Sequence, residues 1–95
     1  MTRTAEIIYC PDLAAMLARA TEAAAAGAQL DSASRADGGT YQPEIIVWTD
    51  NAMIRLRLHA MADGTHHLRR MAANNAAAAI ITAAQTAAAH RQPRA

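Results

Sequence analysis

Apolar and polar positions alternate between Glu44 and Leu58, and this alternation predicts a β-hairpin. The segment reads EIIVWTDNAMIRLRL, and Asp50-Asn51 is a plausible two-residue turn, because both residue types tolerate a positive φ better than most. Counting outward pairs Thr49 with Ala52, Trp48 with Met53, Val47 with Ile54, Ile46 with Arg55, Ile45 with Leu56 and Glu44 with Arg57. Since Glu44 and Arg57 carry opposite charges, this register is favoured over one shifted by a single residue. A four-residue loop from Thr49 to Ala52 would keep the same pairs from Trp48 and Met53 outward.

The register gives the hairpin two different faces. One face is apolar and is expected to lie against helices; it holds Ile45, Val47, Ile54 and Leu56. The other face carries Glu44 and five candidate partner-binding residues, which are Ile46, Trp48, Met53, Arg55 and Arg57. An apolar cluster bordered by arginine has the composition of a protein interface. The alternative is an ordinary solvated sheet face, with arginine stems lying over Trp48 as local packing.

A strand and a helix are predicted before the hairpin. Residues Ala5 to Cys10, AEIIYC, are rich in isoleucine and aromatic character and end at Pro11, which is typical of a strand. Between Pro11 and Gly27, apolar side chains recur at the spacing of one helical face, at Leu13, Met16, Leu17, Ala20 and Ala24. Asp12 places a negative charge at the start of this helix, and Gly27 is a natural end for it.

The remaining segments are expected to be a loop, a long helix and a tail. Residues 28–43 have the serine, aspartate, glycine and proline content of a long flexible loop. A helix is predicted from Asp63 or Thr65 to about His90, and residues 91–95 form a frayed tail. One stripe of this helix is mostly alanine, which favours close packing on another helix: Ala73, Ala76, Ala77, Ile80, Ala83, Ala84 and Ala87. Asn74-Asn75 is its weakest point.

These elements predict a small α/β (α+β) domain spanning residues 1–95. The order strand, helix, strand, strand, helix indicates a two-layer sandwich, a three-stranded sheet with both helices on one face. A crossover through the first helix would place the first strand parallel to the second hairpin strand. The expected core is Ile7, Ile8, Leu13, Met16, Leu17, Ile45, Val47, Ile54, Leu56, Leu58 and Ile80. Because alanine supplies much of the remaining apolar content and buries little area, this core is thin and favours self-association.

Composition narrows the possible settings for the protein. The net charge is +1. The basic residues other than histidine are all arginine, and this together with the excess of alanine indicates a GC-rich bacterial or phage genome. The single cysteine excludes an internal disulfide and favours a cytoplasmic chain. No segment approaches the roughly 20 apolar residues that a membrane helix needs, so no membrane partner is expected.

The sequence offers little for catalysis or metal binding. His66 and His67 are adjacent and point about 100° apart on a helix, so they do not suit one metal ion. Cys10, beside Pro11 at a helix start, has either a lowered pKa or the inertness of a buried thiol. No cofactor, catalytic or metal-binding residues are therefore predicted.

The functional hypothesis is a non-enzymatic protein–protein interaction or assembly module. Its expected partner is a second copy of itself, another protein, or both. The alternative hypothesis is a small nucleic-acid-binding regulatory module, in which Arg55 and Arg57 on the hairpin would contact phosphates and Trp48 would stack on a base.

Overall fold

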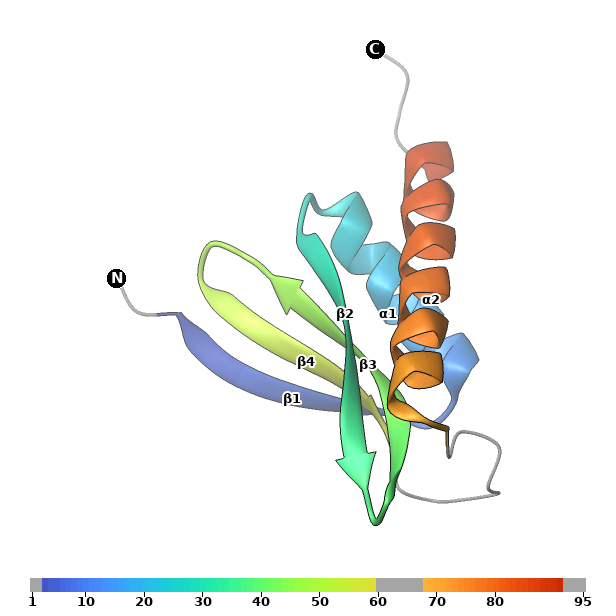
Figure 1. Ribbon diagram of the computed structural model, residues 1–95. Helices are drawn as coiled ribbons and strands as arrows, with labels where there is room; N and C mark the ends of the chain where they lie inside the picture. The colour runs from blue at the N-terminus through green and yellow to red at the C-terminus, as the bar shows by residue number, and fades with distance from the viewer. Residues whose placement is uncertain (1–2, 60–67, 92–95) are drawn as a thin grey trace.

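Four strands and two helices form the part of the chain that the structure, a computed structural model, describes: residues 3–59 and 68–91. The elements are β1 (Thr4–Cys10), α1 (Leu13–Ala25), β2 (Gln29–Asp37), β3 (Thr40–Trp48), β4 (Ala52–Leu58) and α2 (Arg70–Arg91) (Figure 1). The strands make one mixed sheet in the order β1-β4-β3-β2. β1 runs parallel to β4 as predicted, and β3 is antiparallel to both of its neighbours. Both helices cover the same face of the sheet, which confirms the predicted α+β class.

The expected number of strands is wrong, because the predicted loop 28–43 contains a whole strand, the turn Gly38-Gly39 and the start of the next strand, which begins at Thr40 and not at Glu44. Gln29–Asp37 pairs along its whole length with β3, so the sheet has four strands and the element order is β-α-β-β-β-α. Gly38 and Gly39 close this hairpin with φ of 58° and 90°, the left-handed region that a two-residue turn requires and that glycine adopts freely. β2 is an edge strand with Leu30 as its one large apolar residue, so its composition resembles that of a loop.

The register of the second hairpin is confirmed at every position from Trp48 paired with Met53 to Glu44 paired with Arg57. Its turn differs from the expected one, because no described residue other than glycine has a positive φ. The Thr49 hydroxyl oxygen instead accepts hydrogen bonds from the backbone N–H of Ala52, at 2.9 Å, and of Asn51, at 3.3 Å. The register therefore follows from the strands and does not depend on the turn type.

The first helix begins and ends as the sequence predicts. Asp12 is its N-cap, and its Oδ1 accepts a hydrogen bond of 2.8 Å from the Ala15 N–H. Gly27, with φ 89°, follows the last turn and lets the chain reverse into β2. Met16 and Ala20 are the residues by which α1 enters the core.

The second helix runs without interruption through Asn74-Asn75 to Arg91. Its buried stripe is Ala73, Ala77, Ile81, Ala84 and Ala88. The predicted stripe is therefore right at Ala73, Ala77 and Ala84, whereas Ile81 and Ala88 were not in it and the predicted Ala83 is exposed. α2 packs on α1, β2 and β3. Neither described helix combines the length and the apolar character needed to cross a membrane. The helix begins later than predicted, at Arg70, because Leu68 exchanges two backbone hydrogen bonds of 2.8 Å with Tyr41 of β3. The expected caps Asp63 and Thr65, and residues 92–95, lie outside the described residues.

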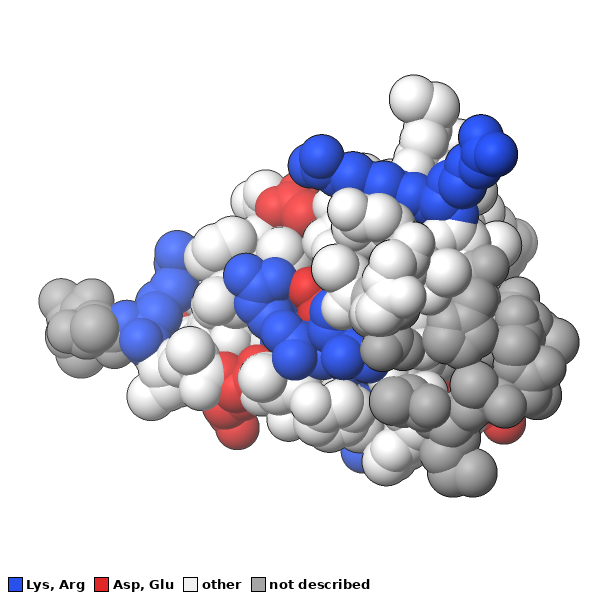
Figure 2. Space-filling view, turned by 60° about the horizontal axis from the view of Figure 1, so that its bottom comes forward, with Lys and Arg blue, Asp and Glu red and all other residues white. Residues whose placement is uncertain are grey.

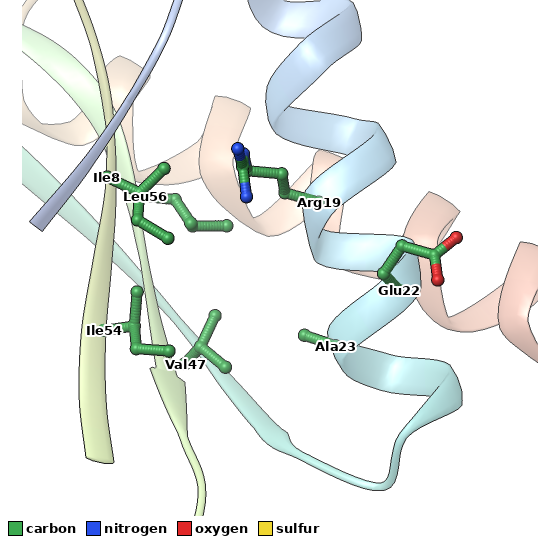
Figure 3. Close-up of a pocket in the computed structure, with 7 residues that line it drawn as sticks. All are labelled: Ile8, Arg19, Glu22, Ala23, Val47, Ile54 and Leu56. Carbon is green, nitrogen blue, oxygen red and sulfur yellow. The ribbon is translucent and has the colours of Figure 1, made fainter. Parts of the chain in front are cut away.

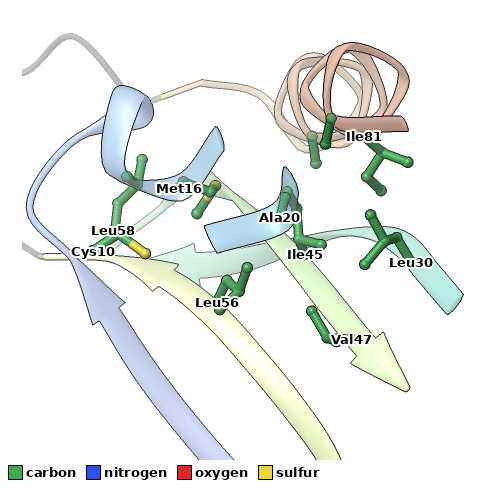
Figure 4. Packing of buried hydrophobic residues seen from close by; sticks show 11 residues of the cluster. Cys10, Met16, Ala20, Leu30, Ile45, Val47, Leu56, Leu58 and Ile81 are labelled. Carbon is green, nitrogen blue, oxygen red and sulfur yellow. The ribbon is translucent and has the colours of Figure 1, made fainter. Parts of the chain in front are cut away.

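The core lies between the helices and the sheet (Figure 4). Five predicted core residues are buried, namely Met16, Ile45, Val47, Leu56 and Leu58, and five more pack against them with part of their surface exposed, namely Ile8, Leu13, Leu17, Ile54 and Ile80. Ile7 was expected in the core and is instead 48% exposed. In β1 the side chains alternate between the two faces, and Ile7 lies on the face that no helix covers.

Candidate interaction face

The side of the sheet opposite the helices is here called the open face. Strand alternation and the pairing register define its members. They are Ala5, Ile7 and Tyr9 from β1, Met53, Arg55 and Arg57 from β4, Gln42, Glu44, Ile46 and Trp48 from β3, and Gln29, Asp31, Ala33 and Arg35 from β2, together with Arg3, which lies over the Trp48 ring. All five residues predicted to bind a partner are therefore on one face.

A buried carboxylate holds two of these arginines together. Glu44 is 2% exposed, and its Oε2 accepts a hydrogen bond from Arg55 Nη1 at 2.8 Å, while its Oε1 accepts one from Arg57 Nε at 2.6 Å. The predicted Glu44–Arg57 pair is confirmed, and Arg55 is an additional partner. Burial lowers the pKa of Arg57, whereas hydrogen bonds with Glu44 and Tyr9 raise it more, so the pKa lies above its usual value. Figure 2 shows arginines side by side with a carboxylate between them.

Trp48, the single tryptophan, is fixed at the other end of the open face. Its indole Nε1 donates a hydrogen bond of 2.7 Å to Asp31 Oδ2 from β2. The guanidinium carbon of Arg3 lies 5.5 Å from the centre of the ring, a cation–π contact. The arginine over the tryptophan is thus Arg3, from ahead of β1. Because the ring is held from both sides, it is presented to a partner with little conformational freedom left to lose.

Strands β1 and β2 add residues that the local sequence pattern did not reveal. Tyr9 is 46% exposed, and its ring centre lies 5.5 Å from that of His59. Ile7 pairs with Arg55 across the parallel ladder, which extends the apolar surface toward the sheet edge. From β2, Arg35 Nη2 donates to Gln42 Oε1 and to the Leu58 carbonyl oxygen, each at 3.2 Å. AEIIYC has no alternation of apolar and polar residues, so only the pairing of β1 with β4 places Ile7 and Tyr9 on this face.

The open face carries a positive charge balance among the side chains that the structure describes. Its arginines are Arg3, Arg35, Arg55 and Arg57, and its carboxylates are Glu44 and Asp31. The carboxylates are already engaged by Arg55, Arg57 and the Trp48 indole. The face therefore combines exposed apolar side chains with an excess of cationic groups.

A groove lies on the helix-covered side, between α1 and the sheet. Its lining is apolar apart from Arg19 and Glu22, and comprises Ile8, Arg19, Glu22, Ala23, Val47, Ile54 and Leu56, around a volume of ≈ 180 Å³ (Figure 3). The Arg19 guanidinium extends from α1 toward Ile8 and Leu56, whereas the Glu22 carboxylate points away from them. A second pocket continues the groove toward the Thr49 turn.

Cys10 is fully buried at the end of β1. Burial raises the pKa of its thiol, the charge of Arg19 lowers it, and that of Asp12 raises it further, so the net pKa lies above the usual value. The thiol is therefore protonated at neutral pH and shielded from solvent. Within the described residues no three His, Cys, Asp or Glu side chains are grouped to hold a metal ion, while His66 and His67 lie outside them.

We expect the Cys10 thiol to react with a disulfide reagent at least about 100-fold more slowly in the folded protein than in denaturant, because reaction requires exposed thiolate. The reaction rate is measured at pH 8 from the release of the reagent's own thiol. An Ala5→Cys variant, with a second thiol on exposed β1, is the matched control and should show one fast and one slow phase. A single fast phase for both thiols would contradict the burial of Cys10.

Comparison of the chain with family models, with curated proteins and with solved structures found no match.

Proposed function

We propose that this protein is a non-enzymatic protein–protein interaction or assembly module that docks through its open face. The observation that carries the proposal is the composition of that face: exposed Ile7 and Tyr9, the fixed ring of Trp48, and arginines held in place by Glu44. Tryptophan, tyrosine and arginine are the residues that contribute most to protein interfaces. The single cysteine is consistent with work in the cytoplasm.

The charge of the open face indicates the chemistry of its partner. With Arg3 and Arg35 free of carboxylate partners within the described residues, an acidic and apolar protein surface complements it best. Packing one open face against the open face of a second copy would bring like charges together. A second copy therefore suits another part of the molecule, while a different protein suits this face.

Nucleic acid is the second candidate partner, and the exposure of Tyr9 is the observation that favours it. Two aromatic side chains, Tyr9 and Trp48, lie on the open face among arginines, as on sheets that stack single-stranded bases. Against this, Arg55 and Arg57 are engaged by Glu44 and would have to exchange that carboxylate for phosphate. Protein is therefore the preferred partner.

The double variant Trp48→Ala/Arg55→Ala should keep the fold and weaken partner binding about tenfold or more, because it removes the rigid aromatic anchor and one cation. Peptides selected from a random display library on the natural protein serve as the probe, with affinity measured by fluorescence anisotropy. We expect the selected peptides to be acidic and apolar, and to bind Gln85→Ala, a variant on the exposed side of α2, with unchanged affinity.

Two results would overturn the protein-binding proposal. Either no peptide discriminates between the natural protein and the double variant, or a labelled single-stranded oligonucleotide binds the open face more tightly than the selected peptides, with an affinity that falls steeply as salt rises.

A further inference from the structure

The outer edge of β1 is unpaired in the described chain and exposes a regular row of backbone groups. Two hydrogen bonds set the pattern at the ends of the strand: the Thr4 N–H donates to the Asn51 carbonyl oxygen at 2.9 Å, and the His59 N–H donates to the Cys10 carbonyl oxygen at 3.1 Å. Even-numbered residues of β1 thus direct their backbone toward β4. Since backbone groups alternate along a strand, Ala5, Ile7 and Tyr9 direct their N–H and C=O groups away from the sheet.

This edge has few of the features that normally prevent strand pairing. It contains no proline or lysine, its ladder with β4 is continuous from Thr4 to Cys10, and Ile7 and Tyr9 are exposed. Glu6 is its one charged side chain. The opposite edge differs, because β2 is rich in polar residues and α2 packs on it.

We propose that β1 pairs antiparallel with β1 of a second copy, around a two-fold axis that passes beside Ile7. This inference rests on the proposed assembly role, because it names a second copy of the chain as one partner of the module. In this register Ile7 faces Ile7 of the second copy, and Ala5 faces Tyr9 of the second copy. The three outward N–H groups and three outward C=O groups of each copy then all find partners.

Charge complementarity on the helix-covered side supports this register. Glu6 of one copy lies opposite Ile8 of the other, and Ile8 lines the groove into which Arg19 extends (Figure 3). Neither Glu6 nor Arg19 forms an ion pair in the described chain, and both are exposed. Glu22, the other charged residue at the groove, is already paired with Arg91. The two-fold axis would therefore create two Glu6–Arg19 pairs, one on each side.

The resulting dimer has one continuous sheet, with four strands from each copy. Its two open faces lie side by side on the same surface, with Ile7 and Tyr9 at the junction. Pairing at the edge avoids the repulsion between arginines that face-to-face packing would cause. Self-association thereby leaves the open face available to a different protein.

Charge reversal tests the two ion pairs by light scattering over a concentration series. The natural protein should have twice the mass of one chain. We expect Glu6→Arg and Arg19→Glu each to raise the dimer dissociation constant roughly 10- to 100-fold, since each variant replaces two attractions by two repulsions. The double variant, which has the net charge of the natural chain, should restore the dimer. Single variants that remain dimeric, or a double variant that stays monomeric, would overturn the ion pairs and with them the register.

Cysteine cross-linking tests the position of the axis. In the proposed register the two Ile7 positions are separated by the spacing of a hydrogen-bonded strand pair, about 5.5 Å between Cα atoms, which a disulfide spans. Ile7→Cys should therefore give a covalent dimer under mild oxidation. Ala5→Cys, on the same edge and face, should not, because the two Ala5 positions lie roughly 13 Å apart along the strands. Equal cross-linking of both variants, or none of Ile7→Cys, would overturn the register.

These outcomes are independent of the peptide selection. A natural protein that is monomeric at all concentrations overturns the pairing of β1 and leaves the open face to the selection experiment. A dimer that passes both tests while selection fails would support the strand pairing and remove the open face as a docking site.

Discussion

Replacing Glu44 with alanine should lower the free energy of unfolding by about 2–3 kcal/mol, which is more than we expect for replacing either of its arginine partners. Glu44 is 2% exposed and receives hydrogen bonds from both Arg55 and Arg57, so its loss leaves two clustered cations without a counter-charge. Removing one partner of a buried ion pair typically costs ~3–5 kcal/mol, and the partial exposure of the arginines reduces that figure. Urea unfolding followed by circular dichroism measures it.

Arg55→Ala provides the comparison, because Glu44 keeps Arg57 in that variant. Its expected cost is about 1 kcal/mol or less, given that the Arg55 side chain is more than one third exposed. A loss of stability for Glu44→Ala no larger than that for Arg55→Ala would mean that the arginines turn into solvent without cost, and that Glu44 does not organise the open face.

Ala77→Leu should destabilise the fold by roughly 2–3 kcal/mol, because Ala77 has no exposed surface and lies where α2 packs into the core. An added isopropyl group there forces the helix away from its neighbours, and overpacking of a filled core usually costs ~1–3 kcal/mol. For a chain of this length such a loss lowers the melting temperature by roughly 10–20 °C. Thermal unfolding followed by circular dichroism measures it.

Ala78→Leu is the matched control, since Ala78 is the next residue of α2 and is exposed. The same substitution there should change stability by no more than about 0.5 kcal/mol. Similar melting temperatures for the two variants would show that the alanine stripe of α2 is not closely packed.

The parts of the fold that could be predicted are those encoded by neighbouring residues. The alternation on both sides of Asp50-Asn51, together with the Glu44–Arg57 charge pair, was enough to predict the register of β3 with β4. The helix after Pro11 could be predicted from its spacing and from its cap and terminal glycine. In each case the stabilising interactions join residues close in sequence.

The missed features have two different causes. β2 pairs with the adjoining strand β3 through the short turn Gly38-Gly39, but its composition resembles that of a loop because it has few large apolar side chains. Ile7 was assigned to the core together with Ile8, but neighbouring residues of a strand point to opposite faces, and no helix covers the face on which Ile7 lies.

The candidate site was predicted only in part, because only some of its residues belong to the hairpin. The five hairpin residues were found because one register places them together. Arg3, Arg35, Asp31 and Tyr9 join them through the pairing of β1 with β4 and of β2 with β3, which the hairpin pattern does not specify.

The parallel pairing of β1 has a consequence for the order of folding. Each antiparallel hairpin joins two strands that are connected by a short turn. β1 pairs instead with β4, which is distant in sequence: Thr4 pairs with Ala52. Closing so long a segment costs more chain entropy than closing a turn. We infer that the hairpins form early and that β1 pairs late. During folding, β4 is therefore an edge strand until β1 pairs with it.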